Sequence, residues 1–319
     1  MVIGISVSPA VYFNSESSGS IPFISFRFAL KSGIMKVVST IKELQEATKG
    51  ANSSPLGFVP TMGALHRGHL SLVQDAVSLC PQVVVSIYVN PTQFNDKNDL
   101  KNYPRTLDND LVMLREVLRE KDLVFTPDDK EIYPAEDRRV FHFGNLENVM
   151  EALHRPGHFN GVAQVVSRMF EIVKPDIAFF GQKDFQQLAV IKELVKQLGS
   201  KIKIIGNPVI REDDGLAMSS RNRLLDPAIR KKARIIFSTI SAAANMINDH
   251  DIPYLIFYVK KTIEKADGFS VEYFDIVDDE ELKPVSARCE MKKGKKYFGC
   301  IAVKAGKIRL IDNIEIPLV

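Results

Sequence analysis

The sequence predicts an α/β protein in which a doubly wound parallel sheet is followed by a second, smaller α+β unit. Short apolar, β-branched runs alternate with amphipathic helical patterns through residues 57–205, which is typical of a parallel sheet with helices on both faces. From about residue 210 this alternation stops, and the chain ends in patterns that indicate helices and antiparallel strands. The length of 319 residues suffices for two domains and a sizeable core.

The expected elements of the first domain occur in a regular order. Five short runs rich in apolar and β-branched residues are predicted strands: residues 57–60, 83–89, 123–125, 177–180 and 202–205. Four longer segments with apolar residues at helical spacing are predicted helices: residues 68–79, 107–119, 161–173 and 185–198. In such sheets the ligand lies outside the carboxyl ends of the strands, so the segments after the strands are the informative ones.

The second domain is predicted to begin near residue 210, where a polar segment follows the last strand of the sheet. Helices are expected at residues 227–248 and 253–265, and antiparallel strands at 271–277, 296–303 and 307–311. This unit is rich in lysine and glutamate and shows no candidate acid/base cluster. The chemistry is therefore expected in residues 35–209, with residues 210–319 forming the smaller domain.

Residues 1–34 differ in composition from the rest of the chain. They are rich in serine, and Glu16, Arg27 and Lys31 are their only charged residues. Such a composition is compatible with an organelle-targeting peptide, although the signal is weak and the apolar core of a secretory signal is missing. Because Met35 opens a well-patterned segment, residues 1–34 are predicted to be a disordered tail or to precede the true start.

The composition argues against several classes of protein. The formal net charge is only +3, so no strong field for nucleic acid or a membrane surface is implied. Apolar runs are shorter than a membrane span. The three cysteines, Cys80, Cys289 and Cys300, are odd in number and lack metal or redox spacing, which favours a reducing cytoplasm.

The most informative segment follows the first predicted strand. Pro60 ends that strand, a glycine-containing turn follows, and His66 and His69 stand three residues apart where a helix begins. A helix N-terminus favours an anion, and two imidazoles on one face can donate to phosphate oxygens. Two ordinary cap histidines are the plain alternative, and a zinc site lacks a third ligand at suitable spacing. The segment predicts a phosphate site for a nucleotide.

Two further strands end in polar segments. Asn90 and Gln93 offer neutral amides that suit a small substrate with hydroxyls and a carboxylate, although an Asn-Pro turn alone explains them as well. Lys183 opposes the dipole of the helix that it precedes, which predicts a contact with phosphate. Asp184 is either an N-cap or an indirect contact to ribose or magnesium.

The segment 215–223, at the domain junction, carries two serines and two arginines after a glycine. These groups fit a triphosphate clamp on a mobile lid, with a solvated linker as the alternative. His158, in a glycine-rich segment, is a further candidate for the substrate pocket. Four carboxylates are candidates for Mg²⁺, with none singled out: Asp108, Asp110, Asp213 and Asp214.

Four of these motifs resemble those of the pantothenate synthetase (pantoate–β-alanine ligase) family. The chain contains, in this order, Pro-Thr-Met-Gly-Ala-Leu-His-Arg-Gly-His, Val-Asn-Pro-Thr-Gln-Phe, Gly-Gln-Lys-Asp-Phe-Gln-Gln and Met-Ser-Ser-Arg-Asn. The likeness runs from Met35 to the end and is strongest over residues 57–224. The His-x-Gly-His element alone would place the chain only among nucleotidyltransferases related to class I aminoacyl-tRNA synthetases. Gln182 stands where the family often has glutamate, and Arg67 occupies a variable position.

The resemblance implies a Rossmann-like first domain, a smaller C-terminal lid domain and a homodimer. It implies ATP, Mg²⁺, (R)-pantoate and β-alanine as ligands, without identifying the ligands of the metal. The pantoate carboxylate would attack the α-phosphorus of ATP, and pyrophosphate would leave. The amine of β-alanine would then attack the pantoyl-adenylate to give pantothenate and AMP. Such chemistry needs positioning and charge stabilisation more than covalent help from the protein.

The family motifs also imply roles for individual residues. His66, His69 and Lys183 would be the catalytic residues, with His69 as the general acid. The implied pantoate site consists of Gln93, Gln187, Asn90 and Met62, with Gln93 also near β-alanine. The implied ATP site consists of Pro60, Thr61, Met62, Gly63, Ala64, Leu65, His66, Arg67, Gly68, His69, Gly181, Gln182, Lys183, Asp184, Ile210, Met218, Ser219, Ser220 and Arg221.

Three other functions stay open at this point. A nucleotidyltransferase for a different small molecule would lack the pairing of the Asn90 and Gln93 amides with that of Gln187. An RNA-binding relative of the synthetases would be expected to show a basic domain, which the near-neutral charge argues against. A regulator without activity would not need every residue of catalytic type that this chain keeps.

Overall fold

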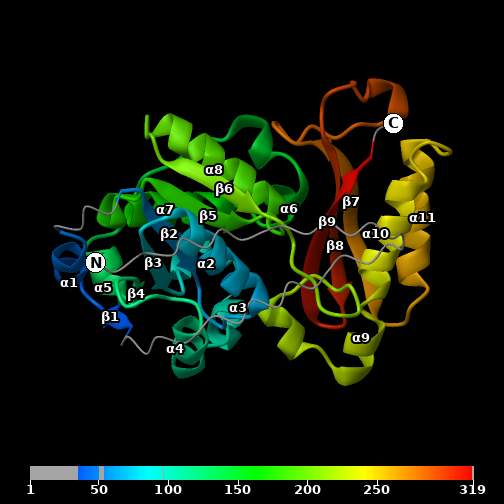
Figure 1. Cartoon of the computed structure of the whole chain (residues 1–319). Coiled ribbons are helices and arrows are strands. Elements are labelled where there is room, and N and C mark those ends of the chain that lie inside the picture. The colour runs from blue at the N-terminus through cyan, green and yellow to red at the C-terminus, as the bar shows by residue number, and fades with distance from the viewer. Residues whose placement is uncertain (1–34, 50–53, 96, 318–319) are drawn as a thin grey trace, which may run out of the picture. The chain divides into compact units, whose positions relative to one another are not determined.

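The computed structural model of the chain describes residues 35–49, 54–95 and 97–317 (Figure 1). The predictions made for residues 1–34 lie outside the described residues. Within the described part of the chain, no helix is long and apolar enough to cross a membrane.

A six-stranded parallel sheet forms the first half of the fold, as the sequence predicts. Its order is β1-β4-β3-β2-β5-β6, and every neighbouring pair runs parallel. The strands are β1 (Lys36–Val38), β2 (Leu56–Thr61), β3 (Gln82–Ile87), β4 (Leu123–Phe125), β5 (Ile177–Gly181) and β6 (Lys203–Asn207). The sequence pattern did not show β1, because this edge strand has only three residues and two of them are exposed.

The strand order reverses at β2. Its neighbours are β3 on one side and β5 on the other, so the chain moves outward from β2 in both directions. In sheets of this type a crevice opens outside the carboxyl ends of the strands at such a point, and ligands bind there. The fold therefore directs attention to the segments that follow β2 and β5.

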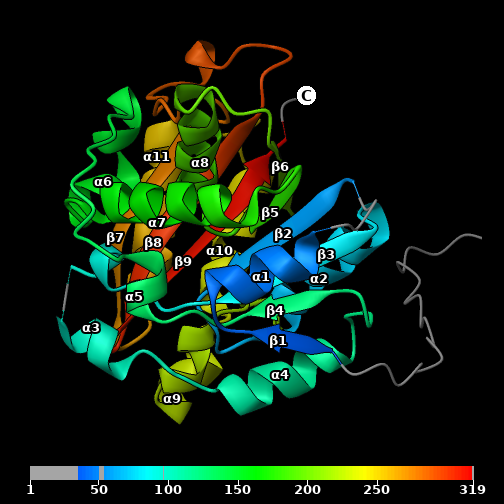
Figure 2. The ribbon, with the colours of Figure 1, turned by 90° about the vertical axis from the view of Figure 1, so that its left-hand side faces the viewer.

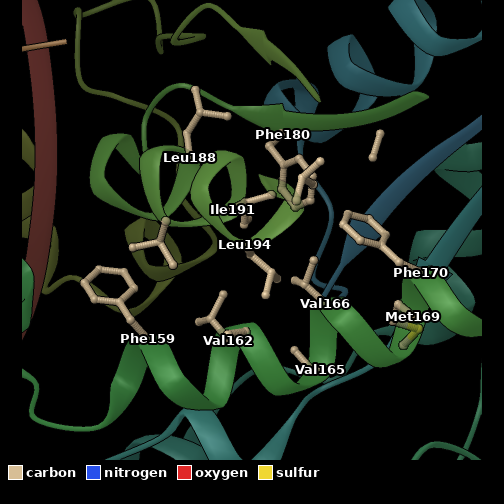
Figure 3. Packing of buried hydrophobic residues seen from close by; sticks show 14 of the residues in the cluster. Phe159, Val162, Val165, Val166, Met169, Phe170, Phe180, Leu188, Ile191 and Leu194 are labelled. Carbon is tan, nitrogen blue, oxygen red and sulfur yellow. The ribbon is translucent and has the colours of Figure 1, made fainter. Parts of the chain in front are cut away.

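Helices cover both faces of this sheet (Figures 1 and 2). Phe58 and Phe180 pack with α1, α7 and α8 in one core cluster, whereas Val59 and Phe179 pack with α2 and α4 in another, because side chains alternate between the two faces of a strand. Figure 3 shows the apolar side of α7 against Phe180 and α8. The helices of this half are α1 (Ile41–Thr48), α2 (Arg67–Leu79), α3 (Lys97–Asn102), α4 (Leu107–Arg115), α5 (Asp129–Ile132), α6 (Met150–His154), α7 (His158–Val173) and α8 (Phe185–Gln197), with short 3₁₀ turns η1 (Pro91–Gln93) and η2 (Gly144–Glu147).

Three predicted helices differ from the observed ones by more than one residue. The helix expected at 161–173 begins earlier, at His158, so this histidine lies in the first turn of the helix and not in the loop before it. The helix expected at 107–119 ends at Arg115, since the amide of Glu116 already bonds three residues back, to Met113. The helix expected at 227–248 consists of α9 (Pro227–Lys232) and α10 (Ile235–Asn245). The two residues between them keep helical dihedral angles, but the N–H groups of Ala233 and Ile236 bond three residues back, to Arg230 and Ala233, where one helix ends and the next begins.

The last third of the chain forms an antiparallel sheet of β7 (Phe269–Asp278), β8 (Tyr297–Ala305) and β9 (Ile308–Ile316). One face packs on α10 and α11 (Ile252–Glu264), and the other joins the core of the first half, where the rings of Phe185 and Phe298 lie 4.4 Å apart. This confirms the α+β character. Two 3₁₀ turns complete the fold, η3 (Ser220–Leu224) and η4 (Arg288–Glu290). Contacts group the described residues into one unit, and the domain boundary near residue 210 stays a prediction.

Candidate active site

A cavity opens at the carboxyl ends of β2 and β5, where the strand order reverses, and a smaller cavity lies beside it. The larger cavity encloses about 220 Å³, against about 30 Å³ for its neighbour, so it is the one with room for a substrate group. Most of the residues that the sequence singled out line it: Pro60, Thr61, Met62, His66, Gly68, His69, Asn90, Gln93, Gly181, Lys183, Asp184, Gln187, Ile210, Met218, Ser219, Ser220 and Arg221.

His66 occupies the N-cap of α2. Its Nδ1 accepts a hydrogen bond from the backbone N–H of Gly68 at 3.2 Å, which satisfies one of the orphan donors of the helix. Because Nδ1 is the acceptor, the proton of the neutral ring is on Nε2, and this N–H is left to donate. A side chain at Gly68 would meet the ring, since its Cβ would lie 2.9 Å from Nδ1 and from Cε1 of His66.

His69 lies against His66, with 4.1 Å between the ring centroids. Its Nδ1 is buried and has no hydrogen-bond partner in the described chain, so this polar atom needs a partner from elsewhere. Burial lowers the pKa of His69 to about 4, with Lys183 acting in the same direction and Asp184 against it. Burial lowers the pKa of His66 to about 2, and the charges of His69, Lys183 and Arg223 add to this effect. Both imidazoles are therefore neutral at pH 7.

Five residues of the implied ATP site do not line the cavity among the described residues. Ala64 and Leu65 are buried, and their backbone N–H groups bind the Asp110 carboxylate at 2.9 and 2.8 Å. Arg67 points to the exposed carboxylate of Asp213, 3.5 Å away. The remaining two are Gly63, in the same buried turn, and Gln182, whose backbone bonds to Asn207 and Asn313.

Gln93 reaches the cavity from η1. Its side-chain Nε2 donates to the sulfur of Met62 at 2.7 Å. Both side chains line the cavity. Asn90 is only 1% exposed, and its amide is occupied: it donates to Thr92 and to the carbonyl oxygen of Gly161, and accepts from the hydroxyl of Tyr133. Asn90 therefore holds the η1 turn in place, and Gln93 has the more accessible amide.

The backbone of η1 is held from below by α7. The His158 Nδ1–H donates to the carbonyl oxygen of Gln93 at 2.8 Å, and burial lowers the pKa of this histidine to about 4. Gly161, one turn further along, contacts the backbone of Thr92. His158 lines the smaller cavity and not the larger one, so the structure places it behind the substrate pocket that the sequence assigned to it.

Three polar side chains lie where β5 passes into α8. Lys183 is half-buried, lines the cavity and forms no ion pair with the described residues, so its charge is available to a ligand. Asp184 occupies the N-cap position of α8, but within the described chain its side chain makes no cap bond. Gln187, one turn later, is half-buried and faces both cavities.

The loop between the two halves forms the remaining wall. The N–H of Met218 donates to the carbonyl oxygen of Ile210, so the loop folds back on itself. Its base is fixed to β9, because Arg211 binds Asp312 with two hydrogen bonds of 2.6 and 3.0 Å. Ser219 caps η3 by accepting from the N–H of Arg221, whose guanidinium pairs with Asp99 at 3.1 Å.

Some residues of the wall were not found from the sequence. Tyr103 lines the cavity, and its hydroxyl lies 3.4 Å from the Ser220 hydroxyl. The apolar side of α7 supplies Val162, Val166 and Met169. The spacing of these apolar residues shows in the sequence, but it is the same as that of core residues, so it gives no separate signal.

The described residues do not form a metal site made of protein side chains alone. The described residues contain no group of three or more histidine, cysteine, aspartate or glutamate side chains that could hold an ion. Of the four candidate carboxylates, Asp110 binds the turn before α2, and Asp214 pairs with Arg230. Asp108 and Asp213 are exposed.

A strand, turn and helix that present two imidazoles at the reversal point of a parallel sheet, with a free lysine and amides around them, define a nucleotide-binding α/β enzyme. Residues 36–315 match the family model described as pantoate-beta-alanine ligase. The chain belongs to the pantoate–β-alanine ligase family, and it is an enzyme that joins pantoate to β-alanine. This confirms the resemblance read from its motifs.

Relatives support this assignment over nearly the whole of their own length. The chain is 47% identical over 283 residues to the pantothenate synthetase of Bacteroides thetaiotaomicron, covering 88% of this chain and 99% of the relative. It is 50% identical over 286 residues to that of Azobacteroides pseudotrichonymphae, with the same coverage. The crystal structure of pantothenate synthetase from Thermus thermophilus aligns with a TM-score of 0.82 at 40% identity, covering 89% of this chain and all of that one. That of the Francisella tularensis pantoate-beta-alanine ligase, complexed with beta-gamma ATP and beta-alanine, aligns at 0.70 and 34%, covering 88% and 97%.

Proposed function

We propose that this enzyme activates (R)-pantoate with ATP and then transfers the pantoyl group to β-alanine. In the first step a carboxylate oxygen of pantoate attacks the α-phosphorus, and the bond from that phosphorus to the bridging oxygen breaks to release pyrophosphate. In the second step the amine nitrogen of β-alanine attacks the pantoyl carbon, AMP leaves and the nitrogen loses a proton. The products are pantothenate, AMP and pyrophosphate. The cavity that joins the histidine pair, Lys183 and two glutamine amides carries this proposal.

The phosphate groups are assigned to the β2–α2 side of the cavity. The Nε2–H of His66 and the first turn of α2 donate toward an anion, and Lys183 adds a full positive charge from the start of α8. Ser219 and Arg221 also line the cavity, where they would contact the same phosphates. His69 is the proposed general acid. Its ring is neutral before substrate binds. The negative charge of a bound phosphate would raise the pKa of His69, so that the ring could take up the proton that it donates.

Pantoate is assigned to the amide side. Gln93 and Gln187 both line the cavity. A neutral amide can both donate and accept hydrogen bonds, so it can bind a hydroxyl as well as a carboxylate. Met62 and the valines of α7 supply an apolar surface for the remaining carbons. Asn90 is assigned the supporting role of holding Gln93, as its occupied amide indicates.

Mg²⁺ is proposed to enter with ATP. This ion keeps several waters and binds through one or two carboxylates together with phosphates, so it needs no protein cage. Asp184 is the single carboxylate among the described residues that line the cavity, and it fits this role. When bound, the ion would neutralise charge on the phosphates. A homodimer and a cytoplasmic location stay predictions, the former testable by the mass of the protein in solution.

The reaction is tested by following AMP release from ATP. With ATP and pantoate but no β-alanine, the enzyme is expected to release about one equivalent of pyrophosphate per active site. Release of AMP is expected to require β-alanine as well. AMP formed with neither substrate, or with another carboxylic acid in place of pantoate, would indicate a different nucleotidyltransferase. Release of AMP on addition of RNA would indicate a relative of the aminoacyl-tRNA synthetases.

A further inference from the structure

We propose that Asp110 is a positioning residue whose carboxylate shapes the turn between β2 and α2 and thereby sets the place of the histidine pair. The proposal rests on the proposed function of that pair. Asp110 lies in the first turns of α4, more than forty residues along the chain from the turn that it binds. Its buried position excludes it from direct contact with a substrate in the cavity.

The turn that Asp110 binds has an unusual backbone. Gly63 and Ala64 both adopt positive φ angles, of +77° and +49°, and Ala64 is one of few residues other than glycine that do so in the described chain. Successive N–H groups in such a turn point to one side and form a concave site for an anion. The carboxylate of Asp110 fills this site from within the protein, because Oδ2 accepts from Ala64 and Oδ1 from Leu65.

The surroundings make this contact hard to replace. Asp110 is 1% exposed, and Ala64 and Leu65 are buried as well, so water cannot supply the acceptors if the carboxylate is lost. The hydroxyl of Thr106 donates a third hydrogen bond, to Oδ1 at 3.1 Å. A side chain at Gly63 would lie 3.0 Å from Oδ2, so glycine at this position leaves room for the carboxylate.

The turn leads directly to the histidine pair. Leu65 is held at both its polar groups, since its N–H binds Asp110 and its carbonyl oxygen accepts from the Arg223 guanidinium at 3.1 Å. The next residue is His66, whose extended backbone and N-cap bond start α2. Fixing Leu65 on two sides therefore fixes the direction in which His66 leaves the turn, and His69 follows one turn of helix later.

Two other roles for Asp110 lead to different expectations. As a magnesium ligand, it would need free lone pairs facing the cavity, whereas three donors from the protein already occupy its oxygens. As a contributor to folding alone, it would affect the stability of the protein without changing the ring geometry of His66 or the turnover of the folded enzyme.

The test is Asp110→Asn, which keeps the shape but turns an amide N–H toward one of the two backbone N–H groups. We expect kcat for pantothenate formation to fall about tenfold or more, because small displacements of catalytic groups have effects of this size. The KM for pantoate is expected to change less than kcat, because Asp110 bonds to Ala64 and Leu65 and not to η1, which presents Gln93. Glu116→Gln, an exposed carboxylate just after α4, is the matched control.

The imidazole ¹⁵N signals of His66 supply a readout that needs no substrate. The wild-type ring should show a single tautomer with the proton on Nε2, and Asp110→Asn should mix the two tautomers. Unchanged kcat together with an unchanged His66 tautomer would overturn the proposal, as would activity restored by excess Mg²⁺. If Asp110→Asn does not fold, Thr106→Val removes one bond to the same carboxylate and must shift kcat and tautomer in the same direction, by less. The tautomer of His66 also tests the effect of Asp110 on the turn if the AMP assay were to indicate a different substrate.

Discussion

Gly161 of α7 and Thr92 of η1 touch backbone to backbone, so that a Cβ on Gly161 would lie 2.5 Å from the carbonyl oxygen of Thr92. The same glycine accepts a hydrogen bond from the Asn90 amide at 3.2 Å. Because the obstacle is backbone, it cannot turn aside as a flexible side chain would. The helix and the turn that presents Gln93 can approach this closely only with glycine at position 161.

Gly161→Ala is therefore expected to move η1 and to weaken pantoate binding. Overpacking of this kind typically costs about 1–3 kcal/mol, and we expect the KM for pantoate to rise by about tenfold as Gln93 shifts. The KM for ATP serves as the internal control, because the β2–α2 side of the cavity does not contact Gly161. Steady-state kinetics with each substrate varied in turn measure both values. Equal increases in the two KM values would contradict the assignment of η1 to pantoate.

Gly68→Ala is expected to act on the phosphate side. The new Cβ would lie 2.9 Å from the His66 ring and would displace it from the N–H that it caps. We expect kcat to fall by about 10- to 100-fold, as for the loss of one preorganised donor. A double-mutant cycle with His66→Ala checks the route: if Gly68 acts through the ring, Gly68→Ala should have little further effect once the ring is gone. Full additivity of the two losses would count against this explanation.

Lys183→Ala tests the free cation of the site. The ammonium forms no ion pair in the described chain, so its removal leaves no protein carboxylate without a partner and should leave stability nearly unchanged. We expect adenylation to fall by about 10² or more, the typical effect of removing a group that stabilises developing charge. Pyrophosphate release with pantoate and ATP measures this step separately from amide formation. Adenylation near the wild-type rate would mean that Lys183 does not contact the phosphates.

The sequence was sufficient for the parts of the fold that depend on local patterns. The runs that became β2, β3 and β5 are apolar on both faces because helices cover both sides of the sheet, and such runs are easily recognised. The edge strand β1 has only three residues and little burial, so it left no pattern. The interruption between α9 and α10 involves only a change of hydrogen-bond partner, without a glycine or proline to mark it.

The candidate site divides in the same way. His66, Lys183 and Gln93 were predictable because each follows a strand, and the carboxyl ends of parallel strands meet at one edge. The residues that hold them in place were not. Asp110 binds the turn at Leu65, and Gly161 meets Thr92, only because the folded chain brings together segments 45 and 69 residues apart, and spacing along the sequence carries no record of such contacts.

The buried histidines predict how stability depends on pH. His66, His69 and His158 have pKa values of about 2, 4 and 4 in the folded chain, well below the ordinary value near 6.5 that the unfolded chain would show. Between about pH 6.5 and 4 the unfolded state therefore binds more protons than the folded state. The free energy of unfolding should fall in this range as pH falls, by about 1.4 kcal/mol per pH unit for each histidine.

Urea unfolding across this pH range, without ligands, measures that slope. His158→Gln should reduce the slope by the contribution of one histidine, while the contributions of His66 and His69 remain. A slope that is the same in the variant and the wild type would show that His158 titrates normally in the folded protein.

A buried ion pair joins α6 to β9. Arg309 donates to both carboxylate oxygens of Glu151 at 2.7 Å, and the Tyr273 hydroxyl adds a third bond of 2.7 Å. Burial alone would raise the pKa of Glu151, but these bonds hold it below its usual range. Glu151→Ala should destabilise the protein by about 3 kcal/mol, at the lower end for breaking a buried pair, because Arg309 keeps Glu272 as a partner.

Replacing both members, as Glu151→Leu with Arg309→Met, should recover much of that loss, since apolar residues of similar volume often substitute for a buried pair without cost. Urea unfolding of the two single variants and the double variant measures the coupling. A double variant as unstable as the sum of the single ones would mean that the two residues stabilise the fold independently.

The same pair holds β9 against the first half of the chain, and Asn313 of β9 donates to the carbonyl oxygen of Lys183 at 3.0 Å. A single Glu151→Ala variant should therefore also slow adenylation, and the double variant should restore it if packing alone keeps β9 in place.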